Sequence, residues 1–125
     1  MTRTLELFKD AKDYKSYAPG EAIFEEGQDG DYMYIIIEGQ VQINSNGSIL
    51  DILSPGHIFG EMALIDDGPR SASARAYSEC KVVPVDQDSF TYCIQHSPSF
   101  AIHVMSIMAE WMRRQIDLLK ASGLT

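Results

Sequence analysis

A glutamate and an arginine nine residues apart are the side chains of this sequence best suited to bind a phosphorylated sugar. Glu61 follows Gly60, and Arg70 follows a Gly-Pro pair at positions 68 and 69. An arginine fork can donate two parallel hydrogen bonds to phosphate oxygens, which a lysine cannot do. A carboxylate such as that of Glu61 accepts hydrogen bonds from sugar hydroxyls. The residue types and their spacing therefore predict a site for a sugar phosphate.

The segment between these two residues is expected to form a short helical turn and then a bend. Residues 62–65 are apolar and follow the Gly60-Glu61 turn. Free backbone N–H groups at the start of a helix attract the same anion as an arginine does. After Arg70, small alanine side chains alternate with Ser73, Arg75 and Tyr77. This alternation predicts a strand that closely approaches a neighbouring sheet or a ligand.

The sequence from residue 22 to residue 85 has short apolar runs separated by Gly/Pro turns, which is typical of an antiparallel sandwich or barrel. Residues 32–37 are apolar on both faces and predict a fully buried strand. Residues 41–44 alternate and predict a half-exposed strand. Asn46-Gly47 is a strong signal for a hairpin turn. Pro84 interrupts the last run and predicts an edge strand or a bulge.

Helices are predicted at both ends of the chain. Residues 4–15 indicate a weak amphipathic helix. Asp88 is a candidate cap for a helix to about residue 95, and Ser97-Pro98 indicates the start of a second helix to about residue 121. That second helix would be roughly 36 Å long and carries a broad apolar arc. We expect it to pack on the β body and on another chain.

Size and composition indicate one domain over residues 1–125. The chain has 45% hydrophobic and 22% charged residues, which is ordinary for a globular protein. Its net charge of −8 argues against a nucleic-acid partner, because a nucleic-acid surface needs clustered basic side chains. No run approaches the ~20 apolar residues of a membrane helix, and no signal peptide is evident. We therefore expect no membrane contact, a cytoplasmic location, and reduced thiols at Cys80 and Cys93.

Neither a metal site nor catalytic machinery is indicated. His57, His96 and His103 form no HxH or HxxxH pair and have no clustered acids, so packing or surface roles are favoured. This spacing also weighs against a cupin-type β-barrel enzyme. The sequence contains no GxSxG motif and no lysine placed as in a P-loop. We expect a protein that is not an enzyme.

Several segments resemble motifs of the cyclic-nucleotide-binding domain family. Residues 26–39 (EGQDGDYMYIIIEG) resemble the family's stretch from an EG pair through an aspartate and a tyrosine to a glycine. Residues 58–64 (IFGEMAL) and 69–72 (PRSA) resemble its FGE(L/M)AL and RSA segments. The resemblance covers nearly the whole chain. It implies a mainly β fold with flanking helices, namely an eight-stranded antiparallel β-roll over about residues 17–86, an N-terminal helix, and C-terminal helices over about 88–121.

The resemblance also implies roles for individual residues. Arg70 would bind the exocyclic oxygens of the cyclic phosphate, and Glu61 would bind the ribose 2′-hydroxyl. Gly60 would let the backbone approach the ligand. The backbone N–H groups of Ala63, Ser71 and Ala72 would be additional donors. The side-chain hydroxyl of Ser71 would be a further donor. Apolar side chains beside the sugar and base would be Val41 and Leu50. The complete predicted set of ligand-binding residues is Val41, Leu50, Gly60, Glu61, Met62, Ala63, Arg70, Ser71 and Ala72.

The predicted function is a non-catalytic sensor of a cyclic mononucleotide, with cAMP favoured over cGMP, that needs no cofactor. The last helix would act as a hinged lid and relay binding to an unidentified protein partner, with a homodimer through this helix as one candidate. Trp111 is a candidate for capping the base, although core or interface packing is favoured. Two alternatives remain open: the ligand-binding domain of a transcription regulator without its DNA-binding module, and a scaffold of the same fold that binds no nucleotide.

Overall fold

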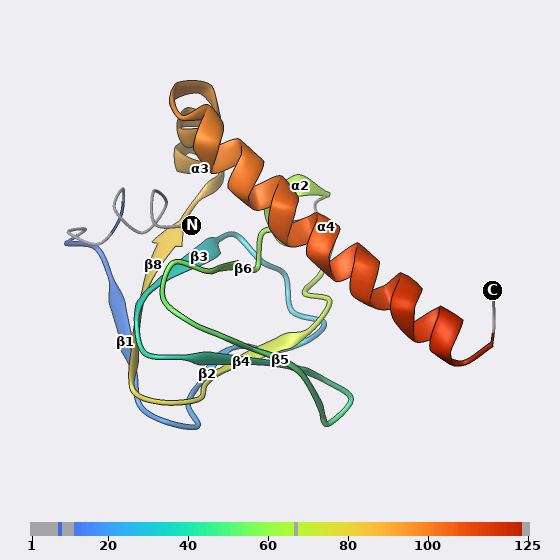
Figure 1. Ribbon diagram of the computed structural model, residues 1–125. Helices are drawn as coiled ribbons and strands as arrows, with labels where there is room; N and C mark the ends of the chain where they lie inside the picture. The colour runs from blue at the N-terminus through green and yellow to red at the C-terminus, as the bar shows by residue number, and fades with distance from the viewer. Residues whose placement is uncertain (1–7, 9–11, 67, 124–125) are drawn as a thin grey trace.

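The computed structural model describes residues 8, 12–66 and 68–123, and its described strands form two four-stranded antiparallel sheets (Figure 1). The first sheet has the order β1 (Lys15–Tyr17), β8 (Cys80–Val85), β3 (Met33–Glu38), β6 (Ile58–Phe59). The second has the order β2 (Ala22–Phe24), β7 (Ser73–Ala76), β4 (Val41–Ser45), β5 (Ser48–Leu53). The predicted eight-stranded antiparallel β-roll with flanking helices is confirmed.

Three helices are described, namely α2 (Met62–Ile65), α3 (Gln87–His96) and α4 (Pro98–Ala121). Helix α4 crosses over the roll and its C-terminal end extends beyond it (Figure 1). The predicted cap of α3 is wrong. Asp86 is the N-cap because its extended backbone leaves its carboxylate free to accept from the Ser89 N–H, whereas Asp88 lies within the first turn.

The predicted helix over residues 4–15 falls mostly outside the described residues. At its end the prediction is wrong, because Lys15 begins strand β1 and pairs with Val82 of β8. This pairing makes β8 an interior strand at residues 80–82, but β1 does not extend to Pro84, so the predicted edge is found locally at the proline. The predicted bulge is not found there, because the register with β3 is regular at Pro84. Pro84 is tolerated there because β1 pairs only with residues 80–82, so no β1 residue faces the proline nitrogen.

The predicted hairpin at Asn46-Gly47 is confirmed. Both residues have positive φ, 51° and 79°, and they connect β4 to β5. A two-residue turn with two positive φ angles matches the right-handed twist of the flanking strands. The hairpin therefore fixes the register of β5, which lies at the edge of the second sheet.

Residues 33–36 of β3 are buried on both faces, as the apolar sequence predicts, whereas Tyr32, which the prediction included, precedes the strand and is 41% exposed. Met33 and Ile35 belong to a core cluster under the helices that includes Phe100 of α4. Tyr34 and Ile36 belong to a second cluster between the two sheets. Because successive side chains of a strand point to opposite faces, one strand joins both clusters. The helices and the roll thus pack against a shared central strand.

Candidate functional site

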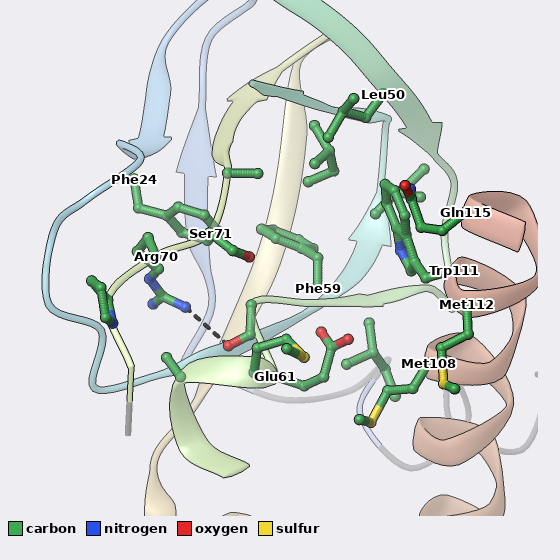
Figure 2. Close-up of a pocket in the computed structure, with 18 residues that line it drawn as sticks. Phe24, Leu50, Phe59, Glu61, Arg70, Ser71, Met108, Trp111, Met112 and Gln115 are labelled. Carbon is green, nitrogen blue, oxygen red and sulfur yellow. Dashed lines mark hydrogen bonds between the residues drawn. The ribbon is translucent and has the colours of Figure 1, made fainter. Parts of the chain in front are cut away.

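A pocket with a volume of about 390 Å³ lies between the α2 segment, the second sheet and α4. Figure 2 shows Arg70 on one side of this pocket and the α4 side chains Trp111, Met112 and Gln115 on the opposite side. Its lining residues are Phe24, Ile43, Leu50, Leu53, Ile58, Phe59, Gly60, Glu61, Met62, Ala63, Pro69, Arg70, Ser71, Ala72, Met108, Trp111, Met112 and Gln115.

Eight of the nine predicted ligand-binding residues line this one pocket, namely Leu50, Gly60, Glu61, Met62, Ala63, Arg70, Ser71 and Ala72. Val41 does not. Its side chain is 0% exposed and belongs to the core cluster between the sheets. Ile43 lines the pocket instead, two residues further along the same face of β4. The alternation of β4 therefore predicted the correct face but the wrong position along it.

Arg70 is buried and its guanidinium is fixed by backbone carbonyls. Only 6% of the residue is exposed. Nη1 donates to the Gly60 carbonyl at 2.9 Å, and Nη2 donates to the Tyr32 carbonyl at 2.7 Å. Burial lowers the pKa of Arg70, opposed by the nearby Tyr34, Asp31 and Glu61. An arginine nevertheless remains charged, so the pocket wall carries a desolvated cation.

No carboxylate of the described residues forms an ion pair with this cation; the ion pairs found there involve Arg75, Lys81 and Arg114. A buried charge is costly unless an opposite charge or strong hydrogen bonds compensate it. The two carbonyls satisfy two of the five N–H donors of Arg70. The site therefore lacks a full negative charge, which an anionic ligand can supply.

Glu61 provides the second polar group of the pocket. The residue is 6% exposed and lies at the N-cap position of α2. Burial raises the pKa of Glu61, and its own backbone hydrogen bond and the positive charge of Arg70 partly oppose that rise. Glu61 and Arg70 make no ion pair, so the carboxylate stays available as a hydrogen-bond acceptor for a ligand hydroxyl.

Two glycines make room for Arg70, and only Gly60 was predicted as a site residue. Gly60 has a φ of 78°, and a Cβ there would lie 2.7 Å from Nη1 of Arg70. A Cβ on Gly30 would lie 2.5 Å from both Cζ and Nε of Arg70. Gly30 belongs to the turn between β2 and β3, and its role was missed because nothing in the sequence links that turn to the arginine.

Helix α4 forms the opposite wall of the pocket. Met108, Trp111, Met112 and Gln115 line it at helical spacing. Trp111 lines the pocket and, as favoured from the sequence, packs against both core clusters. Its role in capping a base stays a prediction. Arg114 of α4 donates to Asp51 of β5 at 2.7 Å and thereby ties the helix to the edge of the second sheet.

The described residues contain neither a cluster that could bind a metal ion nor a helix that could cross a membrane. No three His, Cys, Asp or Glu side chains among them gather in a way that could bind a metal ion. The two cysteines are free thiols. Within the same described part, none of the helices has the length and apolar character needed to cross a membrane. The pocket beside Arg70 therefore remains the site to explain.

The family profile described as "Cyclic nucleotide-binding domain" matches residues 14–97. This match covers well over half of the chain, from β1 to the end of α3. The chain belongs to the cyclic nucleotide-binding domain family. The segment over residues 60–72, which supplies Glu61 and Arg70 to the pocket, lies inside the matched range and is called segment 60–72 below.

Individual relatives agree with this family. The chain is 34% identical over 100 residues to the "CRP-like cAMP-activated global transcriptional regulator" of Mycobacterium tuberculosis, covering 76% of this chain but 45% of that protein. The crystal structure of the Thermus thermophilus Catabolite Activator Protein superposes with a TM-score of 0.78 at 28% identity, covering 96% of this chain and 60% of that one. The chain thus spans about half the length of the curated relatives it matches first.

A further solved chain matches along almost its whole length. It comes from work on a cyclic-GMP-dependent signalling pathway that regulates bacterial phytopathogenesis. Its TM-score is 0.64 at 31% identity, and the match covers 93% of this chain and 92% of that one. Relatives of this domain are therefore associated with both cAMP and cGMP.

Proposed function

We propose that this domain binds a cyclic mononucleotide, preferentially cAMP, without transforming it. Arg70 binds the cyclic phosphate, and Glu61 accepts a hydrogen bond from the ribose 2′-hydroxyl. The observation that carries this proposal is the buried guanidinium of Arg70, which faces the pocket without a carboxylate partner among the described residues. A cyclic phosphate supplies one negative charge of suitable size and geometry for an arginine fork.

Other groups of segment 60–72 support the same ligand. The backbone N–H groups of Ser71 and Ala72 donate to no acceptor within the described residues, and both residues line the pocket. The rest of the lining is mostly apolar and suits the flat faces of a sugar and a base. Relatives named for cAMP support the preference for adenine.

The decisive experiment is a calorimetric titration of the purified protein with cAMP, cGMP and a cyclic dinucleotide. A ligand at a hundredfold excess over Kd stabilises the folded state by about 2.7 kcal/mol, which a thermal scan detects. We expect cAMP to bind more tightly than cGMP and the dinucleotide to bind poorly. If neither mononucleotide gives heat or a thermal shift at millimolar concentration, the proposed function is wrong and the scaffold alternative is favoured.

Two arginine variants test the assigned residue. Arg70→Ala removes charge-assisted hydrogen bonds to the phosphate and is expected to weaken binding by about a hundredfold or more. Arg75→Ala is the matched control, because Arg75 is half-exposed, pairs with Glu25 at 3.2 Å and does not line the pocket. We expect its affinity to stay within about threefold of the wild type. Equal losses in both variants would contradict the role of Arg70.

The signal is proposed to leave the pocket through α4. Trp111 is the only tryptophan of the chain, lines the pocket and belongs to α4, so its fluorescence reports directly on the relation between ligand and helix. We expect the emission to shift when the nucleotide binds, because a ligand that favours one position of the helix changes the population of that position. An unchanged emission spectrum at saturating ligand would contradict the relay.

A second candidate is the ligand-binding part of a transcription regulator. The M. tuberculosis relative is a transcriptional regulator, and the match covers 45% of its length. The continuation of the parent gene beyond Thr125 decides between the candidates. A helix-turn-helix segment there would favour this second one, whereas a stop codon would favour a sensor that acts on a protein partner.

A further inference from the structure

The guanidinium of Arg70 lies against the aromatic ring of Phe24. The Cζ atom of Arg70 is 4.0 Å from the centroid of this ring, within the range of a cation–π interaction. Phe24 is the last residue of β2, far from segment 60–72 in the sequence, and Figure 2 shows its ring beside Arg70. The more distant Tyr34 ring lies at 5.9 Å. Phe24 is thus the principal aromatic partner of the cation.

The turn that follows Phe24 surrounds the same arginine. The Arg70 backbone N–H donates to the Gln28 carbonyl at 2.8 Å, and its carbonyl accepts from the Gly27 N–H at 2.9 Å. Tyr32, at the end of this turn, accepts from Nη2. A Cβ on Gly30 would collide with Cζ and Nε, so the backbone of Gly30 closes against the guanidinium itself. Residues 24–32 form what we call the arginine socket.

These contacts stabilise the buried positive charge of Arg70. A desolvated guanidinium without a carboxylate partner favours any conformation that returns it to water. The face of an aromatic ring offers a region of negative potential, and its effect grows when water is excluded. The ring also blocks rotation of the side chain on one side. The socket therefore keeps the cation at the pocket before a ligand arrives, which lowers the cost of ordering it during binding.

We propose that Phe24 and Gly30 are positioning residues for Arg70: the ring of Phe24 and the Cβ-free backbone of Gly30 hold the guanidinium in its binding orientation. This inference rests on the proposed function, since it concerns how Arg70 reaches the cyclic phosphate. It assigns a part in ligand binding to a segment outside residues 60–72. Phe24 and Gly30 act through Arg70, so their effect appears in ligands that carry the phosphate charge.

The first test observes the arginine in the protein without ligand. In NMR spectra of the wild type, we expect the Arg70 Nε–H signal to be shielded by the ring current of Phe24 and protected from exchange with water. Phe24→Leu removes the ring and keeps an apolar side chain, so the signal is expected to lose both properties. Phe24→Tyr retains the ring and is expected to preserve them. An Arg70 signal that is unchanged in Phe24→Leu would overturn the proposal.

The second test measures ligand affinity by calorimetry. We expect Phe24→Leu to weaken cAMP binding by about five- to tenfold, in line with a desolvated cation–π contact, and Phe24→Tyr to restore most of it. Phe90→Leu is the control for a general loss of packing, because Phe90 is buried in the other core cluster. It is expected to lower the melting temperature but to leave the Arg70 signal in place. Equal cAMP affinity in Phe24→Leu and wild type would overturn the proposal.

Gly30→Ala tests the opposite side of the socket. The new Cβ would force the guanidinium to move, and we expect cAMP affinity to fall by at least tenfold together with a changed Arg70 signal. Gly20→Ala is the control for an added methyl group that meets no neighbour: its Cβ would have nothing within 4 Å, and Gly20 does not line the pocket. Unchanged affinity in Gly30→Ala would count against the socket. If the wild type binds no cyclic nucleotide, the proposed function fails, while the NMR signature still tests whether Phe24 orients Arg70.

Discussion

The two sides of the pocket differ in how firmly they are held. In segment 60–72, Glu61 and Arg70 are each 6% exposed, and the backbone of Arg70 is hydrogen-bonded to the turn at Gly27 and Gln28. At the other side, every residue of α4 from 112 onward is exposed. Among the described residues, the Arg114–Asp51 contact is the only ion pair that ties this helix to a sheet.

We infer from this difference that one side of the pocket is suited to ligand recognition and the other to a conformational response. Recognition of a charged group requires side chains in fixed positions, and those are provided by segments hydrogen-bonded to each other across the roll. A response requires an element that can move at little cost, and such elements have few buried contacts. The fully buried anchors of α4, which include Phe100, Val104 and Ile107, all lie in its first half. The second half is held by the partly buried Trp111 and by the Arg114–Asp51 pair. Because it has fewer buried contacts, we expect the second half to move more readily than the first when the pocket is occupied.

The largest effect on stability is expected at the anchor of α4. Phe100 is 0% exposed and packs against Phe8 and Phe90, so Phe100→Ala should destabilise the fold by about 3–5 kcal/mol in chemical denaturation. Leu118→Ala is the comparison in the second half of the same helix, where the side chain is 63% exposed. Its cost should stay below about 0.5 kcal/mol. A large, concentration-dependent cost for Leu118→Ala would break the comparison and would indicate that another chain covers this half of α4.

An intermediate effect is expected at Glu61. Burial raises its pKa, so the folded state binds a proton more readily than the unfolded chain does, and the charged carboxylate costs stability at pH values above that raised pKa. Glu61→Gln should therefore raise the melting temperature of the ligand-free protein at neutral pH by a few degrees, roughly 1 kcal/mol. The gain should vanish as the pH falls through the pKa of Glu61, where the wild-type carboxyl also becomes neutral.

The same variant should bind the nucleotide less well. A neutral amide accepts a weaker hydrogen bond from the ribose hydroxyl than a carboxylate does, so we expect a loss of roughly tenfold in affinity. Wild-type affinity should fall as the pH drops through the Glu61 pKa, and the variant should lack this dependence. Titrations over a pH series test both statements, and a variant that is neither stabilised nor weakened would show that Glu61 is not a charged acceptor.

The smallest effect on stability is expected at the tether of α4. The Arg114–Asp51 pair is partly exposed, so Arg114→Gln should cost less than about 1 kcal/mol. Nucleotide release should nevertheless accelerate several-fold in stopped-flow measurements, because the second half of α4 loses its ion pair to β5. Lys81→Gln is the matched control, since it removes an exposed pair with Glu38 in the first sheet, away from the pocket. If both variants release ligand equally fast, the tether has no role in the lid.

Much of the site was predictable because its chemistry is local in the sequence. Gly60, Glu61 and Arg70 lie within one short segment whose turn and helix follow from neighbouring residues, and the structure places all three at one pocket. The hairpin at Asn46-Gly47 was predictable for the same reason, since two residues that accept positive φ are sufficient to define it.

The socket around Arg70 was not predictable from spacing. Tyr32 accepts its hydrogen bond from a residue 38 positions away, and Phe24 ends a strand whose sequence indicates only an apolar run. The position of Val41 failed for a related reason. Alternation tells which side chains of a strand share a face, but the stretch of that face that meets a pocket depends on how the sheets pack.

The sequence by itself therefore predicted an antiparallel β body and a pair of polar groups suited to a sugar phosphate, because these depend on turn chemistry, periodicity and residues that are neighbours in the chain. Its motifs carried the resemblance that identified the family and implied the β-roll. Tertiary structure alone decided that Arg70 is buried without a carboxylate partner within the described residues and that Phe24 and Gly30 enclose it. It also decided that α4 forms one wall of the pocket and that the helix is exposed from residue 112 onward. Those features arise from long-range packing, where the neighbours of a side chain come from segments that are distant in the sequence.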